Sequence, residues 1–277
     1  MLASVRIAFP LIMLFSAAVA CAEPVGFRVA YEDKDTPDHT GSGEAVPEDP
    51  GILVELIRQV QQRLPDLHIS FSRRPWARCL AELESGDADA IFSSSFKPER
   101  LKIGVYPMRD GKDDRTYRID TKSYSLFKLR DSPVDWDGSR LGNVKTEIAA
   151  MRGYAIVDDL TKMGVAVREV NNSESGFRML LAGRVDGFAQ LTEVGDYTLK
   201  KTPAFNGVVK LSPPLVVRDY YLQVSHPFQA KHPALTLVIW KALADIRRTE
   251  LDRLTAKYMR RYEEGPADAS PQAPASK

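Results

Sequence analysis

The sequence of 277 residues has little of several features that mark common classes of protein. Its two cysteines, Cys21 and Cys79, are too few for a disulfide-rich scaffold or a four-cysteine zinc site. Its 38 basic residues are balanced by 37 acidic residues, so no basic surplus points to nucleic acid as a partner. Only residues 7–19 form a long apolar run, and this run is shorter than the roughly 20 residues of a membrane span. We therefore expect a soluble globular protein.

Motifs for catalysis and for metal binding are absent as well. None of the four histidines lies four residues from another or next to a cysteine, so the sequence predicts no metal site. There is no Gly-x-Ser-x-Gly nucleophile elbow and no Walker-type glycine loop, and no cofactor is predicted. His39 and His232 lie among polar, loop-like residues, so we expect both on the solvated surface. These absences argue against an enzyme.

The first 22 residues have the pattern of a secretory signal peptide. Arg6 precedes the apolar run, and small residues at 20–22 permit cleavage before Glu23. The alternative is that Cys21 carries a lipid anchor. In the soluble form Cys79 is the only thiol, and its position on the apolar face of a predicted helix favours burial.

The residues that follow alternate between strand-like and helix-like patterns. Apolar residues with a period of two, or in short runs, predict strands at 27–31, 69–71 and 88–93. Apolar residues spaced by three and four predict helices at 53–64 and 76–83, the second ending at Gly86. Strands that alternate with helices in this way predict an α/β fold with a mostly parallel sheet.

A second block of the same kind begins near Leu141. Its predicted elements are helices at 154–163 and 177–181 and strands at 165–170 and 185–191. Beyond residue 217 we expect a strand at 220–225 and two helices, at 235–246 and 251–262. If these helices pack on the first block, the chain crosses twice between two lobes, and the crossings form a hinge. The charged stretch 109–122 is interpreted as a surface excursion near this hinge.

The most informative segment is 87–100. Three hydroxyls, on Ser93, Ser94 and Ser95, follow a buried strand, and Arg100 comes five residues later. Loops at the carboxyl ends of parallel strands border the crevice where open α/β sheets bind ligands, and arginine can hold two oxygens of a carboxylate at once. The alternative is a serine-rich turn that caps a helix, with Arg100 as a solvated charge.

Several segments, taken in order, resemble a known family. They are 50–56 before the first predicted helix, 74–80 at the start of the second, 83–90, 93–100, 152–154 in the second lobe, and 221–225. In order and spacing they are similar to the family 3 bacterial periplasmic solute-binding proteins, which include the polar amino acid receptors of ABC importers. The resemblance covers residues 26–262. It implies a two-lobed periplasmic-binding-protein fold of type II, in which each lobe is a mostly parallel sheet flanked by helices and the ligand cleft lies between the lobes.

The resemblance also implies roles for individual residues. Arg100 stands where the family grips the α-carboxylate of its ligand, and Ser93 and Ser95 stand where it makes polar contacts. Trp76 occupies a position that lines the side-chain pocket, although a core role at the start of a helix is the alternative. Gly153 and Tyr154 match a turn in the second lobe whose backbone N–H groups face the ligand, although Tyr154 could instead simply pack its helix.

One departure from the family concerns the ligand ammonium. Amino acid receptors of this family carry an acidic residue just after the strand that ends near Gln190, and this sequence has Leu191 there. Glu193 and Glu32 are candidate substitutes. Because a buried ammonium without an anion is costly, an ordinary amino acid ligand is in doubt, and a carboxylate without an amine is an alternative.

The predicted organisation has five parts: a signal peptide (1–22), the first part of lobe 1 (23–129), lobe 2 (130–217), the returning part of lobe 1 (218–262) and a disordered tail (263–277). The resemblance implies a monomeric receptor of the bacterial periplasm that captures a small polar solute, an amino acid or a related carboxylate, and docks on the membrane permease of an ABC importer. Two alternatives remain: a sensor or signalling subunit with the same fold, and a dehydratase-like enzyme in which Glu193 or Glu32 acts as acid or base.

Overall fold

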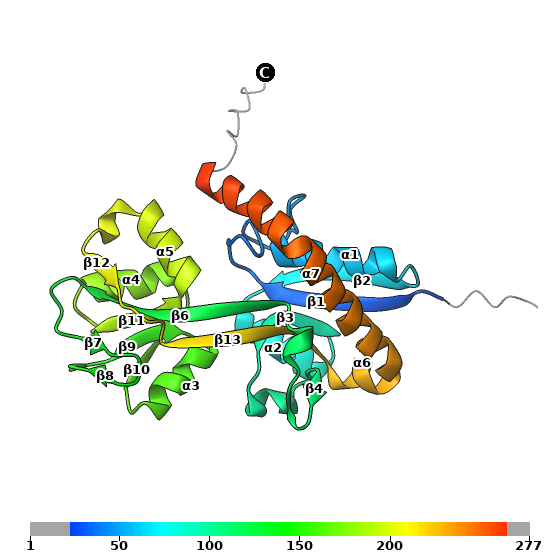
Figure 1. Ribbon diagram of the computed structural model, residues 1–277, viewed down its shortest axis with the longest axis horizontal. Coiled ribbons are helices and arrows are strands. Elements are labelled where there is room, and N and C mark those ends of the chain that lie inside the picture. Colours follow the sequence, from blue (N-terminus) through cyan, green and yellow to red (C-terminus); the bar gives the residue numbers. More distant parts are fainter. Residues whose placement is uncertain (1–22, 265–277) are drawn as a thin grey trace, which may run out of the picture.

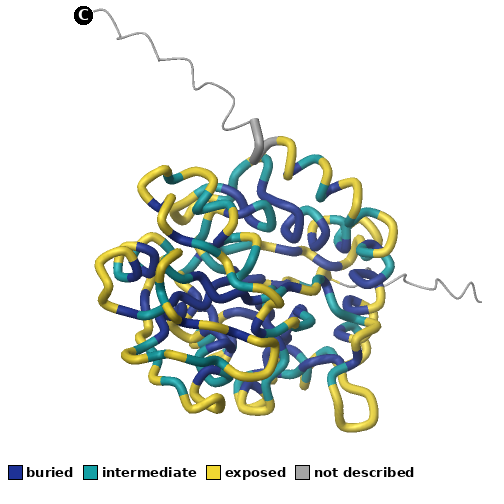
Figure 2. Tube along the Cα trace, turned by 60° about the vertical axis from the view of Figure 1, so that its left-hand side comes forward, coloured by how far each residue is buried: buried dark blue, intermediate teal, exposed yellow. Residues whose placement is uncertain are grey.

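The computed structural model describes residues 23–264 and has two lobes joined by a pair of long strands (Figure 1). The predicted signal peptide and residues 265–277 of the predicted tail lie outside the described residues. Most of the large apolar side chains of both lobes are buried. Figure 2 shows the buried residues in the interior and the exposed residues along the outer turns and helix faces. Within residues 23–264, no helix is both long and apolar enough to cross a membrane.

The first lobe contains the alternating elements that the sequence predicts. They are β1 (Val25–Glu32), α1 (Ile52–Arg63), β2 (Leu67–Arg74), α2 (Trp76–Ser85) and β3 (Ala90–Ser95). Strand β1 lies between β2 and β3 and is parallel to both. Gly86 ends α2 in the left-handed conformation, with φ of 79°, as the sequence suggested. The parallel order brings the carboxyl ends of all three strands to one edge.

The second lobe repeats this construction. Its elements are β9 (Ile148–Met151), α3 (Ala155–Lys162), β10 (Val167–Val170), α4 (Ser173–Leu181), β11 (Gly187–Leu191), α5 (Thr192–Lys201) and β12 (Val208–Lys210). Strand β9 is parallel to β10 and to β11. Phe127, Phe177 and Phe188 pack edge to face in the core of this lobe, and Phe205 packs against Phe177.

Two antiparallel strands run through both lobes, β6 (Asp120–Leu129) and β13 (Val216–Val224). In the second lobe β6 pairs with β11, and in the first β13 pairs with β3, so one sheet has the order β10-β9-β11-β6-β13-β3-β1-β2. Figure 1 shows both strands passing from lobe to lobe. The lobe boundaries set from the sequence, at 130 and 217, lie just after β6 and inside β13, and they stay a prediction.

The expectation of two separate helices at the end of the fold was wrong. After the short α6 (His226–Lys231), a single helix, α7, runs from Pro233 to Glu264. No glycine or proline interrupts it, and Ile246, Leu254 and Tyr258, at multiples of four, keep one buried face. It packs on α1, where Glu55 accepts hydrogen bonds from Lys257 Nζ and Tyr258 Oη, each at 2.6 Å.

The stretch 109–122 is only partly the predicted surface excursion. It holds an exposed two-stranded hairpin and a 3₁₀ turn, but Lys122 is buried inside β6, with 7% of its surface exposed. The remaining short elements are η1 (Pro98–Lys102), β4 (Met108–Arg109), β5 (Lys112–Asp113), η2 (Arg115–Tyr117), β7 (Asp135–Trp136), β8 (Leu141–Gly142) and η3 (Pro203–Phe205).

The burial predicted for Cys79 is confirmed, since the residue has no exposed surface. Burial raises the pKa of its thiol well above the usual value, so little reactive thiolate forms near neutral pH. In a chain lacking residues 1–22, which has this thiol alone, we expect Ellman's reagent at pH 8 to react at least about a hundredfold more slowly with the native than with the urea-unfolded protein. Rapid native reaction would show that α2 does not cover the sulfur.

Candidate ligand-binding site

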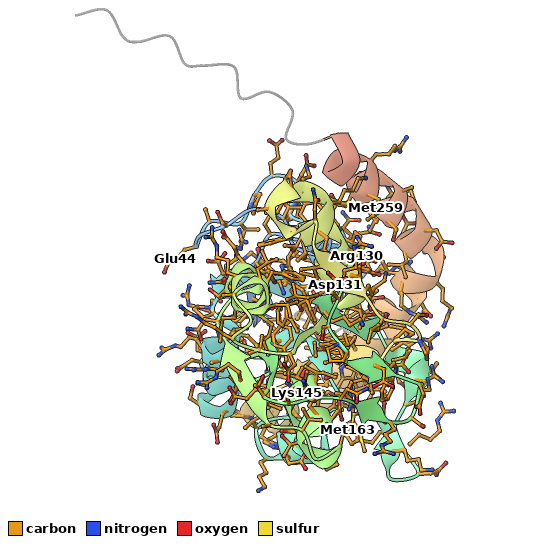
Figure 3. All side chains as sticks on the ribbon, turned by 90° about the vertical axis from the view of Figure 1, so that its left-hand side faces the viewer. Glu44, Arg130, Asp131, Lys145, Met163 and Met259 are labelled. Atoms are coloured by element: carbon orange, nitrogen blue, oxygen red, sulfur yellow. The ribbon has the colours of Figure 1, made fainter. Side chains whose placement is uncertain are left out.

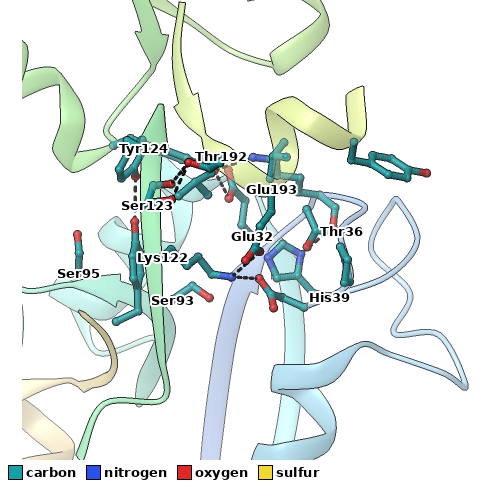
Figure 4. Close-up of a pocket in the computed structure, with 18 of the residues that line it drawn as sticks. Glu32, Thr36, His39, Ser93, Ser95, Lys122, Ser123, Tyr124, Thr192 and Glu193 are labelled. Atoms are coloured by element: carbon teal, nitrogen blue, oxygen red, sulfur yellow. Dashed lines mark hydrogen bonds and ion pairs between the residues drawn. The ribbon is translucent and has the colours of Figure 1, made fainter. Parts of the chain in front are cut away.

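A cavity of about 320 Å³ lies between the lobes, near the ends of β1 and β3 (Figure 4). Residues from both lobes, from the linking strands and, through Met259, from α7 line it. Figure 3 labels Met259 near the far end of that helix. Five aromatic rings contribute, on Trp76, Tyr124, Tyr154, Tyr197 and Tyr220. The charged lining residues are Glu32, Lys34, Asp35, Asp38, Arg100, Lys122, Glu193, Asp196 and Lys200. Aromatic walls with polar groups that face the same cavity are typical of small-molecule sites, and the charged lining residues indicate a polar or charged ligand.

Arg100 lines the cavity with 8% of its surface exposed. The turn η1 after β3 carries it, and its own carbonyl is fixed by Gln223 Nε2 at 2.9 Å. Its Nη1 donates to the Ser95 carbonyl at 3.0 Å and to Ser95 Oγ at 3.3 Å. Its Nη2 donates across the cleft to the Gly153 carbonyl at 3.1 Å, and the guanidinium lies 5.5 Å from the centre of the Trp76 ring.

Three polar atoms of the cavity lining are buried without a hydrogen-bond partner in residues 23–264. They are Trp76 Nε1, Ser93 Oγ and Thr36 Oγ1. Ser93 adopts the uncommon left-handed conformation, with φ of 56°, and Trp76 and Thr36 are only 7% and 6% exposed. A buried donor without an acceptor is unfavourable, so these atoms indicate where a ligand's acceptor oxygens would be stabilised.

The three serines do not act together as expected. Ser93 and Ser95 line the cavity, but Ser94 Oγ bonds to Tyr106 Oη at 2.6 Å and Gln223 Oε1 at 2.8 Å inside the first lobe. Successive side chains of a strand point to opposite faces, which places Ser94 on the far side. Ser94 was expected to contact the ligand, but in the structure its hydroxyl instead holds β3 to Tyr106 and Gln223.

The turn at Gly153 also differs from expectation. The Gly153 N–H donates to Glu169 at 3.2 Å and the Tyr154 N–H donates to the Met151 carbonyl at 3.1 Å, so neither faces the cavity. It is the carbonyl of Gly153 that faces Arg100. Gly153 is not among the lining residues, whereas the Tyr154 side chain is.

Tyr154 connects the lobes through its hydroxyl. It donates to Glu32 at 2.5 Å and accepts from Lys34 Nζ at 3.1 Å. Burial, together with the nearby Glu32 carboxylate, raises the pKa of Tyr154 well above its usual value, so the hydroxyl keeps its proton. Glu32, named from the sequence as a candidate, therefore already has partners in the protein.

Lys122 forms the centre of a charged cluster in the cavity lining (Figure 4). Its ammonium pairs with Asp38, with Asp120 at 2.7 Å and with Glu193 at 3.8 Å. Burial lowers the pKa of Lys122, but the carboxylates of Asp38 and Asp120 outweigh it, and the pKa lies well above the usual value. Leu191, at the family's acidic position, presents an apolar side chain to the same cavity.

Sequence reasoning missed the loop 33–50, which carries Lys34, Thr36, Asp38 and His39 to the cavity. The solvated surface position expected for His39 was wrong. It is 5% exposed, its Nδ1 lies 2.7 Å from the Lys34 carbonyl, and burial lowers its pKa. His232 is half-buried beside Phe228 rather than solvated. No local pattern marks this loop, because the buried Arg73 side chain fixes it from 28 and 32 positions away, through the carbonyls of Ala45 and Gly41.

An ion pair outside the cavity also joins the lobes, between Lys97 beside β3 and Asp158 on α3. If it stabilises the closed form, Lys97→Met is expected to weaken ligand binding about threefold, or about 0.6 kcal/mol, since partly exposed pairs contribute about 0.2–1 kcal/mol. Titration calorimetry of both single variants and the double variant with Asp158→Asn measures the coupling. Arg178→Met, which breaks an ion pair within α4, is the control. Equal effects of Lys97→Met and Arg178→Met on the dissociation constant would contradict a role of the Lys97–Asp158 ion pair in closure.

Comparison with known proteins identifies the family to which the chain belongs. The chain belongs to the bacterial extracellular solute-binding proteins, family 3, because the model of that family matches residues 28–261. A search of curated proteins found no significant match. The fold is the type II periplasmic-binding-protein fold, with a ligand cleft between two lobes.

Three similar solved structures are low in sequence identity but alike in fold. A histidine kinase sensor domain with similarity to periplasmic binding proteins has 19% identity and a TM-score of 0.64, over 84% of this chain and 96% of that one. The GluR0 ligand-binding core in complex with L-glutamate has 14% identity and a TM-score of 0.63, over 84% and 98%. The substrate-binding protein of an amino acid ABC transporter has 16% identity and a TM-score of 0.63, over 85% and 100%.

Proposed function

We propose that this protein is a periplasmic receptor that captures a small solute bearing a carboxylate and delivers it to the permease of an ABC importer. The observation that carries the proposal is the part of the cavity lining around Arg100. The buried guanidinium is bonded only to neutral oxygens within residues 23–264, and it lies 5.5 Å from the centre of the Trp76 ring. The unpartnered donors Trp76 Nε1 and Ser93 Oγ line the same cavity, so an anionic ligand there could pair with the guanidinium and accept hydrogen bonds from donors that the protein leaves free.

The cross-lobe contacts support capture by closure. Arg100 meets the Gly153 carbonyl, and Glu32 and Lys34 meet the Tyr154 hydroxyl, so the two lobes touch through groups that also line or border the cavity. A ligand that bridges the same groups favours the closed form by its differential affinity for that form. This role requires binding and closure, and no catalytic residue. The family match and the transporter-type structure of similar fold are consistent with it.

A thermal-shift screen tests the proposal. The chain without residues 1–22, unfolded and refolded to remove carried-over ligand, is screened against amino acids, other carboxylates, amines and small oxyanions. A true ligand at 100 times its dissociation constant adds about 2.7 kcal/mol to the free energy of unfolding and raises the melting temperature. We expect hits among carboxylates. Hits confined to amines would contradict the site, and unchanged cellular uptake of the ligand after deletion of the protein would favour a sensory role over transport.

A further inference from the structure

Resting on the proposed function, we infer that the ligand is a carboxylate with an apolar, ring-sized body and no ammonium group, because Lys122 and other groups of the protein already engage the carboxylates that line the cavity. The inference follows from the partners of every acidic residue that lines the cavity and from the kinds of group left without partners.

Each lining carboxylate is engaged by the protein itself. Asp38 and Glu193 face the ammonium of Lys122, the first in direct contact and the second at 3.8 Å. Glu32 accepts the Tyr154 hydroxyl, which Lys34 also contacts, and Asp196 pairs with Lys210. Asp35 accepts the Gly41 N–H at 2.8 Å. An incoming ammonium would have to compete with a cation or donor of the protein at each of these positions.

The cluster around Lys122 is the closest to a cation site. Its two shielded carboxylates, Asp38 and Asp120, have side chains that are 15% and 21% exposed, and both contact the buried ammonium. The third, Glu193, is 75% exposed and therefore hydrated, which weakens its attraction for a ligand. Lys122 lies on β6, one of the two strands that link the lobes. Its ammonium therefore already provides these carboxylates with the positive charge that the ammonium of an amino acid ligand would bring.

The groups without partners favour an anion. Trp76 Nε1 can only donate, and Ser93 Oγ lines the same cavity as Arg100. Within residues 23–264 the Arg100 guanidinium donates to neutral oxygens of Ser94, Ser95 and Gly153 and to no carboxylate. A carboxylate held at Arg100 would have its body next to the Trp76 indole, since the guanidinium lies over that ring. The rings of Tyr124, Tyr154 and Tyr220 and the side chain of Leu191 supply further apolar lining.

Matched ligands that differ only in the α-ammonium test this inference. Calorimetric dissociation constants are measured for 3-phenylpropanoate against L-phenylalanine and for 4-methylpentanoate against L-leucine. We expect the amine-free acid of each pair to bind at least tenfold more tightly. This wild-type comparison does not depend on the folding of any variant. Equal or tighter binding of the amino acids, or no binding by the amine-free acids, would overturn the inference.

A variant that is expected to gain affinity for amino acids provides a second test. Lys122→Met leaves Asp38 and Asp120 without their cation, so the preference is expected to shift at least tenfold toward the amino acid of each pair. Lys128→Met is the matched control, because Lys128 lies on the same strand, is not among the residues that line the cavity, and donates its ammonium to the Ser132 carbonyl at 2.7 Å. An equal shift in both variants would overturn the role of Lys122. Amino acids that bind in an Arg100-dependent way would refute this inference but keep the proposed receptor, whereas silence of all carboxylates would refute both.

Discussion

Replacing Arg100 with methionine is expected to weaken the binding of a carboxylate ligand at least about a hundredfold, which corresponds to about 2.7 kcal/mol. The guanidinium is buried, faces the Trp76 ring and is held in place by Ser95 and Gly153, so it is preorganised to hold two carboxylate oxygens. Each hydrogen bond to a charged group contributes about 1.5–3 kcal/mol. The methionine variant loses the two hydrogen bonds that the guanidinium would donate to the carboxylate oxygens. Calorimetry with the best carboxylate from the screen measures the loss.

Two controls separate loss of recognition from loss of structure. Arg100→Lys keeps the charge but not the planar fork, so its affinity should fall between those of the wild type and the methionine variant. The primary amide of the same ligand should bind the methionine variant about as well as the carboxylate does, because that variant no longer distinguishes charge. A carboxylate preference that survives Arg100→Met would refute the assigned anion grip.

Substituting Gly51 with alanine is expected to lower the free energy of unfolding by about 2–6 kcal/mol. This range combines about 1–3 kcal/mol for placing a side chain in a backbone region that essentially only glycine adopts with about 1–3 kcal/mol for overpacking. Gly51, the residue before α1, has φ of 107° and ψ of 165°, and an added Cβ would lie 2.4 Å from the Asp38 carbonyl oxygen and 2.5 Å from His39 Cα. The same turn satisfies the first N–H groups of α1, since Ile52 and Leu53 donate to the carbonyls of Pro37 and Asp38. Ligand binding should weaken too, because Asp38 and His39 line the cavity.

Gly43→Ala is the matched control for this variant. Gly43 also has a positive φ, of 82°, but nothing lies within 4 Å of an added Cβ, so only the conformational cost of about 1–2 kcal/mol is expected. Urea unfolding of the two variants measures the difference. Similar losses in both would show that contact between the loop 33–50 and the start of α1 does not stabilise the protein.

The elements that the sequence predicted correctly are those with local signals. The apolar stripe of α1 and the glycine that ends α2 depend on neighbours a few residues away, so periodicity finds them. The sequence predicted two helices where the structure has α7, because Leu251, five residues after Ile246, does not continue the three-and-four spacing of the apolar residues before it. The helix nevertheless continues, because Leu254 and Tyr258 restore the buried face and no residue in between breaks it. Strand β6 was missed because charges surround its start, although Lys122 there is buried.

The candidate site could be predicted in part for the same reason. Two of the short segments that resemble the family, 74–80 and 93–100, contain four residues that line the cavity: Trp76, Ser93, Ser95 and Arg100. The partners that set their chemistry come from far along the chain, as in the pairing of Lys122 with Asp38, 84 positions apart. Likewise, the turn at Gly153 faces Arg100 with its carbonyl, because Glu169 on β10 takes the N–H. Such contacts leave no periodic trace in the sequence.

The packing of α7 on α1 has a consequence for the order in which the protein folds. The first lobe takes its strands from residues 25–95 but receives Trp240, Leu243, Ile246, Leu254 and Tyr258 from α7 to complete its core. The elements of the second lobe from β9 to β12 lie together in residues 148–210 and can associate while the chain is still growing. The first lobe has to wait until residue 258 has been synthesised, and contacts of such long sequence separation form slowly. We therefore expect the first hundred residues of the nascent chain to remain unfolded until α7 has been synthesised.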